Sequence, residues 1–119
     1  MSIVTLAIPA HAQHVALVRT AAASLAAHVG FTIDRIDDVR LAIDEAVAVS
    51  LPFADVDQTV GIEIELVTAG LEIRIQTATT HTTRPAENTF AWTVLGALVD
   101  ELCARVDDGT LHISLRLST

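Results

Sequence analysis

The apolar residues of this chain change their spacing at Pro52, and this change limits the folds that the chain can adopt. Between Gln13 and Pro52, apolar side chains recur every three or four residues, as in helices that pack on one side. Beyond Thr59 they alternate with polar side chains, as in strands that have one covered face. We therefore predict an α+β domain in which helices lie on one face of a sheet.

The first half of the chain is predicted to contain one strand and two helices. Their expected bounds are residues 3–8 for the strand, 13–29 for the first helix, and 32 or 34 to about 51 for the second helix. Pro9 cannot extend a strand ladder, and Gly30 is a residue type that often ends helices. The second helix has three acids near its start, Asp34, Asp37 and Asp38, and these interact favourably with the positive end of the helix dipole.

The second half is predicted to contain a hairpin, a long loop, a third helix and a last strand. The expected bounds are 59–68 and 71–77 for the hairpin strands, 78–88 for the loop, and 110–117 for the last strand. The third helix should start after Asn88 or Thr89, which are capping residue types. It is expected to bury five residues with helical spacing, Phe90, Val94, Leu95, Leu98 and Leu102.

The composition fits one domain over residues 1–119 with an aliphatic core. Half of the residues are apolar (51%) but only 3% are aromatic, so Ala, Val, Leu and Ile must fill the core. The formal charge is −8, and the bases are all Arg. Nucleic acid requires clustered cations, so direct nucleic-acid binding is not expected. The acidic surface suits either a basic protein partner or simple solubility.

The start of the sequence and its single cysteine favour a cytoplasmic protein without a membrane segment. No charged residue precedes Arg19, so the basic region of a signal peptide is missing. The uncharged stretch between Arg19 and Asp34 has 14 residues, fewer than the roughly 20 that a spanning helix needs. Cys103 has no second cysteine to pair with, and its spacing favours plain core filling over redox sensing.

Three segments of the sequence carry a family resemblance. They read Ile-Pro-Ala-His-Ala-Gln-His-Val-Ala-Leu-Val-Arg (residues 8–19), Arg-Leu-Ala-Ile-Asp-Glu-Ala-Val-Ala-Val (residues 40–49) and Leu-Val-Asp-Glu-Leu (residues 98–102). Together they resemble the anti-sigma regulatory serine/threonine kinases of the GHKL ATPase superfamily, and the resemblance covers essentially the whole chain. It implies a two-layer α/β sandwich with a mixed sheet and three main helices on one face.

The second helix departs from this family at the position that holds magnesium. The family pattern is Glu-Ala-x-x-Asn, and the resemblance implies that Glu activates the attacking hydroxyl while Asn coordinates Mg²⁺. Glu45 is kept, whereas Val49 stands at the Asn position. Mg²⁺ needs oxygen ligands, and a Val side chain has none. Glu45 is therefore interpreted as a solvated acid, with a vestigial base as the alternative.

The other nucleotide-binding positions of the family are also changed. Where the family has Asp-x-Gly to accept the adenine amino group, this chain has Thr77 and Thr79. A Thr hydroxyl supplies neither the charge of Asp nor the bare backbone of Gly. Thr89 and Ala91 replace the glycines that let the backbone approach the phosphates. We expect no bound cofactor, with ATP and Mg²⁺ disfavoured, and no phosphoryl transfer.

The resemblance and the altered positions together suggest a protein-binding function. The segment from Phe90 to Leu95, Phe-x-Trp-x-Val-Leu, is similar to non-kinase anti-sigma factors of mycobacteria and related actinobacteria. This implies a homodimer that sequesters a sigma factor and releases it to an anti-anti-sigma antagonist. The alternative is an active kinase that phosphorylates the antagonist with Glu45 as base. Arg19 matches a family position that contacts both partners, although an ordinary surface arginine remains equally open.

Other residues give weaker signals. His11 and His14 have a spacing that can chelate metal, but no further ligand completes a set, so no metal site is expected. Trp92 is interpreted as a core residue, with a partner contact as the alternative. For the Thr-rich loop the composition leaves two interpretations open, a remnant of an ATP lid and a phosphorylation target.

Overall fold

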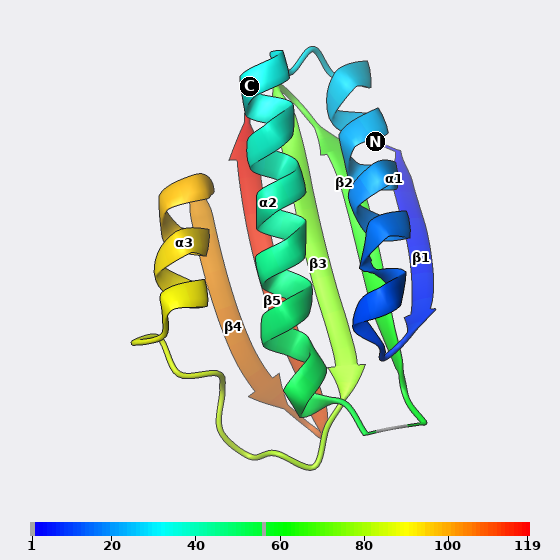
Figure 1. Cartoon of the computed structure of the whole chain (residues 1–119), viewed down its shortest axis with the longest axis vertical. Coiled ribbons are helices and arrows are strands. Elements are labelled where there is room, and N and C mark those ends of the chain that lie inside the picture. The colour runs from blue at the N-terminus through cyan, green and yellow to red at the C-terminus, as the bar shows by residue number, and fades with distance from the viewer. Residues whose placement is uncertain (1, 56) are drawn as a thin grey trace.

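A computed structural model of the chain describes residues 2–55 and 57–119, and it places three helices on one side of a five-stranded sheet (Figure 1). The strands are β1 (Ile3–Pro9), β2 (Thr59–Val67), β3 (Gly70–Ala78), β4 (Glu101–Asp107) and β5 (Thr110–Ser118). The helices are α1 (Val15–His28), α2 (Ile33–Ser50) and α3 (Phe90–Leu98), with short 3-10 turns η1 (Ala12–His14) and η2 (Leu51–Phe53). The predicted α+β fold with one covered sheet face is confirmed.

The sheet has the order β1-β2-β3-β5-β4, and every neighbouring pair of strands is antiparallel. The expectation of a mixed sheet was therefore wrong. Strands β3 and β4, which α3 connects, do run in the same direction, but β5 lies between them and pairs antiparallel with both. The parallel relation that a crossover helix creates is thus never a hydrogen-bonded one.

The predicted bounds of α1, α2 and the β2–β3 hairpin agree closely with the structure because local signals set them. Gly30, which follows α1, has a φ of 87°, a conformation that favours glycine. The hydroxyl of Thr32 accepts a hydrogen bond from the backbone N–H of Arg35 and caps α2. The hairpin turn consists of Thr68 and Ala69, because Val67 pairs directly with Gly70.

The third helix is shorter than predicted, and a fourth strand that the sequence analysis missed follows it. Helix α3 ends at Leu98, and Leu102 lies in β4. Strand β4 forms a hairpin with β5 through Asp108 and Gly109, whose φ angles of 50° and 74° are those of the tight turns that join twisted strands. The pairing with β5 satisfies the backbone of residues 101–107, so the helix does not continue.

The core lies between the helices and the covered face of the sheet. In Figure 1, α1 lies over β1 and β2, α2 over β3 and β5, and α3 over β4. The side chains that fill this layer are mostly aliphatic, and the largest include Ile43, Ile62, Ile64, Leu71, Ile73, Ile75, Leu95, Leu111, Ile113 and Leu117. Fully buried Ala22, Ala26, Ala42 and Ala46 allow α1 and α2 to pack closely. Within residues 2–55 and 57–119, no helix is long and apolar enough to cross a membrane.

Phe90 is the clearest exception to the predicted core. It was expected to point inward from the third helix, but it is 82% exposed. Leu95 is fully buried, and Trp92 is half-buried and packs against the core, as the sequence indicated. Helix α3 is therefore anchored by a few side chains, and its first residue projects into solvent.

Candidate functional site

The candidate site lies on the C-terminal half of α2, on the side that faces away from the sheet. Helix α2 is held against the sheet by the buried residues Val39, Ile43 and Val47. Because a helix has 3.6 residues per turn, this stripe leaves Glu45 and Val49 half-buried beside it. The residues that the family resemblance assigns to catalysis and metal binding are thus accessible from solvent.

Three of the positions that the resemblance assigns to nucleotide binding meet around one hollow. Val49, Thr89 and Ala91 line a space of about 250 Å³ between α2, η2 and the start of α3. Phe53 of η2 and Pro85 of the long loop complete most of its apolar wall. We call this space the loop-side hollow. Its lining contains no charged side chain, so it offers neither a metal ligand nor a cation for phosphate.

The polar atoms near the loop-side hollow are used within the protein. The Thr89 hydroxyl accepts a hydrogen bond from the backbone N–H of Trp92 at 3.2 Å and caps α3. The loop before it packs on η2, where the rings of Phe53 and His81 lie 4.5 Å apart. This contact helps to fix the wall of the hollow.

Thr77 and Thr79 do not line the loop-side hollow, although the family resemblance places them at the adenine site. The Thr77 hydroxyl donates to the backbone carbonyl of Thr59 at 3.0 Å. The Thr79 hydroxyl accepts from the backbone N–H of His81 at 3.0 Å. Both residues are buried, and their hydroxyls stabilise the end of β3 and the start of the loop.

Glu45 has no catalytic partner in the part of the chain that the structure describes. Its carboxylate is half-buried and makes no hydrogen bond or ion pair with the described residues. A general base needs a nucleophile or a water held in reach. The geometry is that of an acid at the edge of the site.

A second hollow lies on the other side of α2, next to α1, and contains Arg19. This α1-side hollow has a volume of about 260 Å³ and is lined largely by apolar side chains that include Val15, Val47 and Leu51. The Arg19 Nε lies 3.4 Å from Asp44 Oδ1, and about a third of each side chain is exposed. The attraction between them orients Arg19 along the wall of the hollow.

Asp44 is a residue of the site that the sequence analysis missed. Its Oδ1 is buried but has no hydrogen-bond partner among the described residues, because the nearby Arg19 Nε is close enough for charge attraction yet poorly directed for a hydrogen bond. The sequence signal was present, since an acid beside Glu45 on an otherwise apolar turn is unusual. Only the packing of α1 against α2 places it opposite Arg19.

One small residue, Ala48, is exposed on α2 and lines both hollows. We call the two hollows, together with Ala48 between them, the α2 groove. The exposed Phe90 follows Thr89 and precedes Ala91, which both line the groove at its loop-side end. Large exposed apolar residues next to an apolar depression are typical of binding surfaces.

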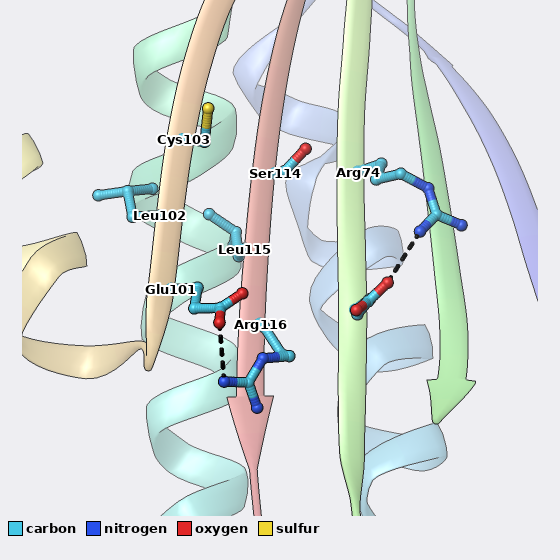
Figure 2. Close-up of a pocket in the computed structure, with 8 residues that line it drawn as sticks. Arg74, Glu101, Leu102, Cys103, Ser114, Leu115 and Arg116 are labelled. Atoms are coloured by element: carbon cyan, nitrogen blue, oxygen red, sulfur yellow. Dashed lines mark hydrogen bonds and ion pairs between the residues drawn. The ribbon is translucent and has the colours of Figure 1, made fainter. Parts of the chain in front are cut away.

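The open face of the sheet carries a different kind of surface. Figure 2 shows a hollow on this face, of about 340 Å³, in which Arg116 pairs with Glu101 at 3.1 Å and Arg74 pairs with Glu72 at 3.3 Å. The hydrogen bond from Arg116 lowers the pKa of Glu101 below its usual value. Both arginines of this hollow are paired within the chain, so they offer no free cation to an anionic ligand.

Arg74 pairs with several carboxylates on the open face of the sheet. Its guanidinium contacts three carboxylates, with Glu65 at 2.9 Å, Glu63 at 3.3 Å and Glu72 at 3.3 Å. Partial burial acts to lower the pKa of Arg74, but the hydrogen bonds to Glu65 and Glu63 outweigh it and raise the pKa. The pairs hold β2 and β3 in register on their open side.

Cys103 also lies on the open face, beside Ser114 in Figure 2. The interpretation of Cys103 as core filling on a helix was wrong, because it is an exposed residue of β4.

The two histidines whose spacing can chelate metal, His11 and His14, have ring centroids 6.4 Å apart. Across residues 2–55 and 57–119, no cluster of three or more His, Cys, Asp or Glu side chains is arranged to hold a metal ion.

The sequence matches no protein-family model, and it matches no curated protein. The fold is similar to the crystal structure of the RsbU and RsbW domains of Rv1364c from Mycobacterium tuberculosis, with a TM-score of 0.75 and 16% sequence identity. The match covers 99% of this chain and 32% of that one, so this chain spans about a third of the other's length. At this identity the comparison establishes the fold alone, a two-layer α/β sandwich.

Proposed function

We propose that the chain is an anti-sigma factor that binds and sequesters a sigma factor without phosphoryl transfer. The observation that carries the proposal is the loop-side hollow. Val49, Thr89 and Ala91, the positions that the resemblance assigns to magnesium and phosphate binding, line this hollow, and its wall is largely hydrocarbon. Hydrocarbon neither ligates Mg²⁺ nor neutralises phosphate, whereas apolar depressions are common in protein interfaces.

A structural comparison and a sequence resemblance both support this proposal. The chain shares its fold with a structure that contains RsbU and RsbW domains. The segments quoted above resemble the anti-sigma regulatory family. In this proposal an anti-anti-sigma antagonist competes with the sigma factor, so the two partners shift one binding equilibrium and release follows their relative affinities and amounts.

Arg19 is proposed as a partner contact. Its Nε lies 3.4 Å from Asp44 Oδ1, and the guanidinium donates no hydrogen bond to the described residues. A guanidinium can bind a partner carboxylate in a two-point arrangement. Arg19→Ala should weaken partner binding at least about tenfold while the melting temperature changes little. A loss of fold together with binding would make Arg19 structural instead.

Co-expression tests the central proposal. Each sigma factor encoded in the genome that encodes this chain is produced with it, and co-purified pairs are measured by isothermal titration. One sigma factor should form a stoichiometric complex at micromolar concentration. If none does, the proposal is wrong.

The proposal also states that neither ATP nor Mg²⁺ is bound and that the working form is a cytoplasmic homodimer. Calorimetric titration with Mg²⁺-ATP should give no binding heat, and light scattering should give twice the mass of one chain. The competing hypothesis is a kinase that uses Glu45 as base. Incubation with labelled ATP and the antagonist distinguishes the two, since phosphate transferred to the antagonist would reject the non-kinase proposal.

A further inference from the structure

The α2 groove has the shape of a site for two neighbouring apolar side chains of one partner. Its hollows measure about 260 and 250 Å³, and Ala48 lines both. An apolar cavity of roughly 150 Å³ is large enough to hold benzene, so each hollow has room for a Leu or Phe side chain. Both hollows open onto the helix side of the molecule, where a macromolecule can reach them.

The carboxylates near the α1 end of the groove indicate that the partner segment also carries a basic side chain. Asp44 Oδ1 is buried and has no hydrogen-bond donor within the described part of the chain. About a third of the Asp44 side chain is exposed, so a cationic partner side chain can pair with the accessible part of this carboxylate. Glu45 adds a second half-buried carboxylate one residue along α2.

The charge of the whole chain acts in the same direction. With a formal charge of −8, the protein attracts basic partners and repels acidic ones before contact. A nucleotide fits this surface poorly, because it would bring several negative charges to a groove whose one cation, Arg19, is already close to Asp44.

We propose that the α2 groove binds a basic, amphipathic segment of a partner protein. One bulky apolar side chain enters each hollow, and a Lys or Arg side chain of the segment pairs with the exposed part of the Asp44 carboxylate. Phe90 extends the apolar surface at the loop-side end. This inference rests on the proposed function only for the kind of partner, a protein, and its test does not require the sigma factor to be known.

The test uses a fluorescein-labelled model peptide of about four helical turns, with Leu on one face and Lys on the other, and measures binding by anisotropy. The same peptide with Ser in place of Leu, and another with Glu in place of Lys, serve as controls. The Leu/Lys peptide should bind with micromolar affinity, and both controls should bind at least about tenfold more weakly. Equal binding of the Leu/Lys and Ser/Lys peptides would show charge attraction without the hollows and would overturn the proposal.

Two pairs of variants place the binding in the groove. Ala48→Arg puts a long side chain between the hollows and should weaken the Leu/Lys peptide at least about tenfold. Ala97→Arg adds the same charge to an exposed residue of α3 outside the groove lining and should change affinity less than about twofold. Asp44→Asn should weaken binding about fivefold, whereas Asp37→Asn, an exposed acid on the same helix, should have no such effect.

The outcomes for this inference and for the proposed function are separable. If Ala48→Arg and Ala97→Arg bind the peptide equally, or if wild type does not bind it, the groove proposal fails even if a sigma factor forms a complex. If the peptide binds and Ala48→Arg abolishes binding while no sigma factor associates, the groove proposal stands and the anti-sigma function fails. The melting temperatures of the variants verify that each is folded.

Discussion

Arg35 connects the start of α2 to the far ends of three other elements, and its removal gives a sharp test of how this fold is held together. Its Nε donates to the carbonyl of Ser118 at 2.9 Å, and its Nη1 donates to the carbonyl of Leu98 at 2.7 Å. It also contacts the carboxylates of Asp100 at 2.9 Å and Asp38 at 3.1 Å. One side chain therefore joins α2, the end of α3, the start of β4 and the end of β5.

The expected cost of Arg35→Ala follows from these four contacts. The side chain is only 21% exposed, so water replaces the lost partners incompletely. Each of the two carbonyl bonds should contribute about 1 kcal/mol, and each of the two carboxylate pairs about 0.5 kcal/mol. The free energy of unfolding should fall by about 3 kcal/mol, which for a domain of this size lowers the melting temperature by roughly 12 °C.

Arg40→Ala is the matched control on the same helix. Arg40 pairs with Asp37 at 2.7 Å, but the two side chains are 47% and 60% exposed and the pair stays within α2. Its loss should cost no more than about 0.5 kcal/mol. Urea unfolding followed by circular dichroism measures both variants, with midpoints compared at equal slope. A loss below about 1 kcal/mol for Arg35→Ala, or a loss equal to that of Arg40→Ala, would refute the reasoning.

Three further predictions concern the strands. Hydrogen bonds from a backbone N–H and a hydroxyl at the end of β5 lower the pKa of Asp100. Its ionised form therefore stabilises the fold at neutral pH, and the melting-temperature deficit of Asp100→Asn should shrink as the pH falls below about 4; a constant deficit would contradict this. Gly70→Ala should destabilise by about 1–3 kcal/mol in urea, because its Cβ would lie 2.5 Å from the Leu117 carbonyl oxygen, whereas Gly61→Ala, with its nearest atom at 3.5 Å, should be almost neutral. Cys103 is exposed and should react stoichiometrically with a thiol reagent in the folded protein, and protection until unfolding would place it in an interface.

The helices before Pro52 and the hairpin after Thr59 could be predicted because their boundaries depend on residues close in sequence. A glycine with positive φ ends α1, a threonine side chain caps α2, and a two-residue turn sets the register of β2 and β3. None of these features needs a distant partner. For the same reason the long loop and the last strand were placed correctly.

Residues 98–107 were assigned wrongly because two periodicities fit them. Leu98 and Leu102 have helical spacing, whereas Leu102, Ala104 and Val106 alternate as in a strand. The Asp-Gly pair at 108 and 109 is a hairpin signal that should have favoured the strand. The pairing of β4 with β5 makes residues 101–107 a strand, and it also places Cys103 on the open face.

The sequence alone indicated that Val49, Thr89 and Ala91 lack the chemistry to hold magnesium nucleotide, since that depends only on the atoms in each side chain. Whether they act as one surface depends on chain segments about 40 residues apart meeting in space, and only the fold brings them around a single hollow. The packing of α1 on α2 likewise sets Asp44 beside Arg19. The atoms of one side chain can be read from the sequence, but a shared hollow exists only where distant segments of the chain pack together.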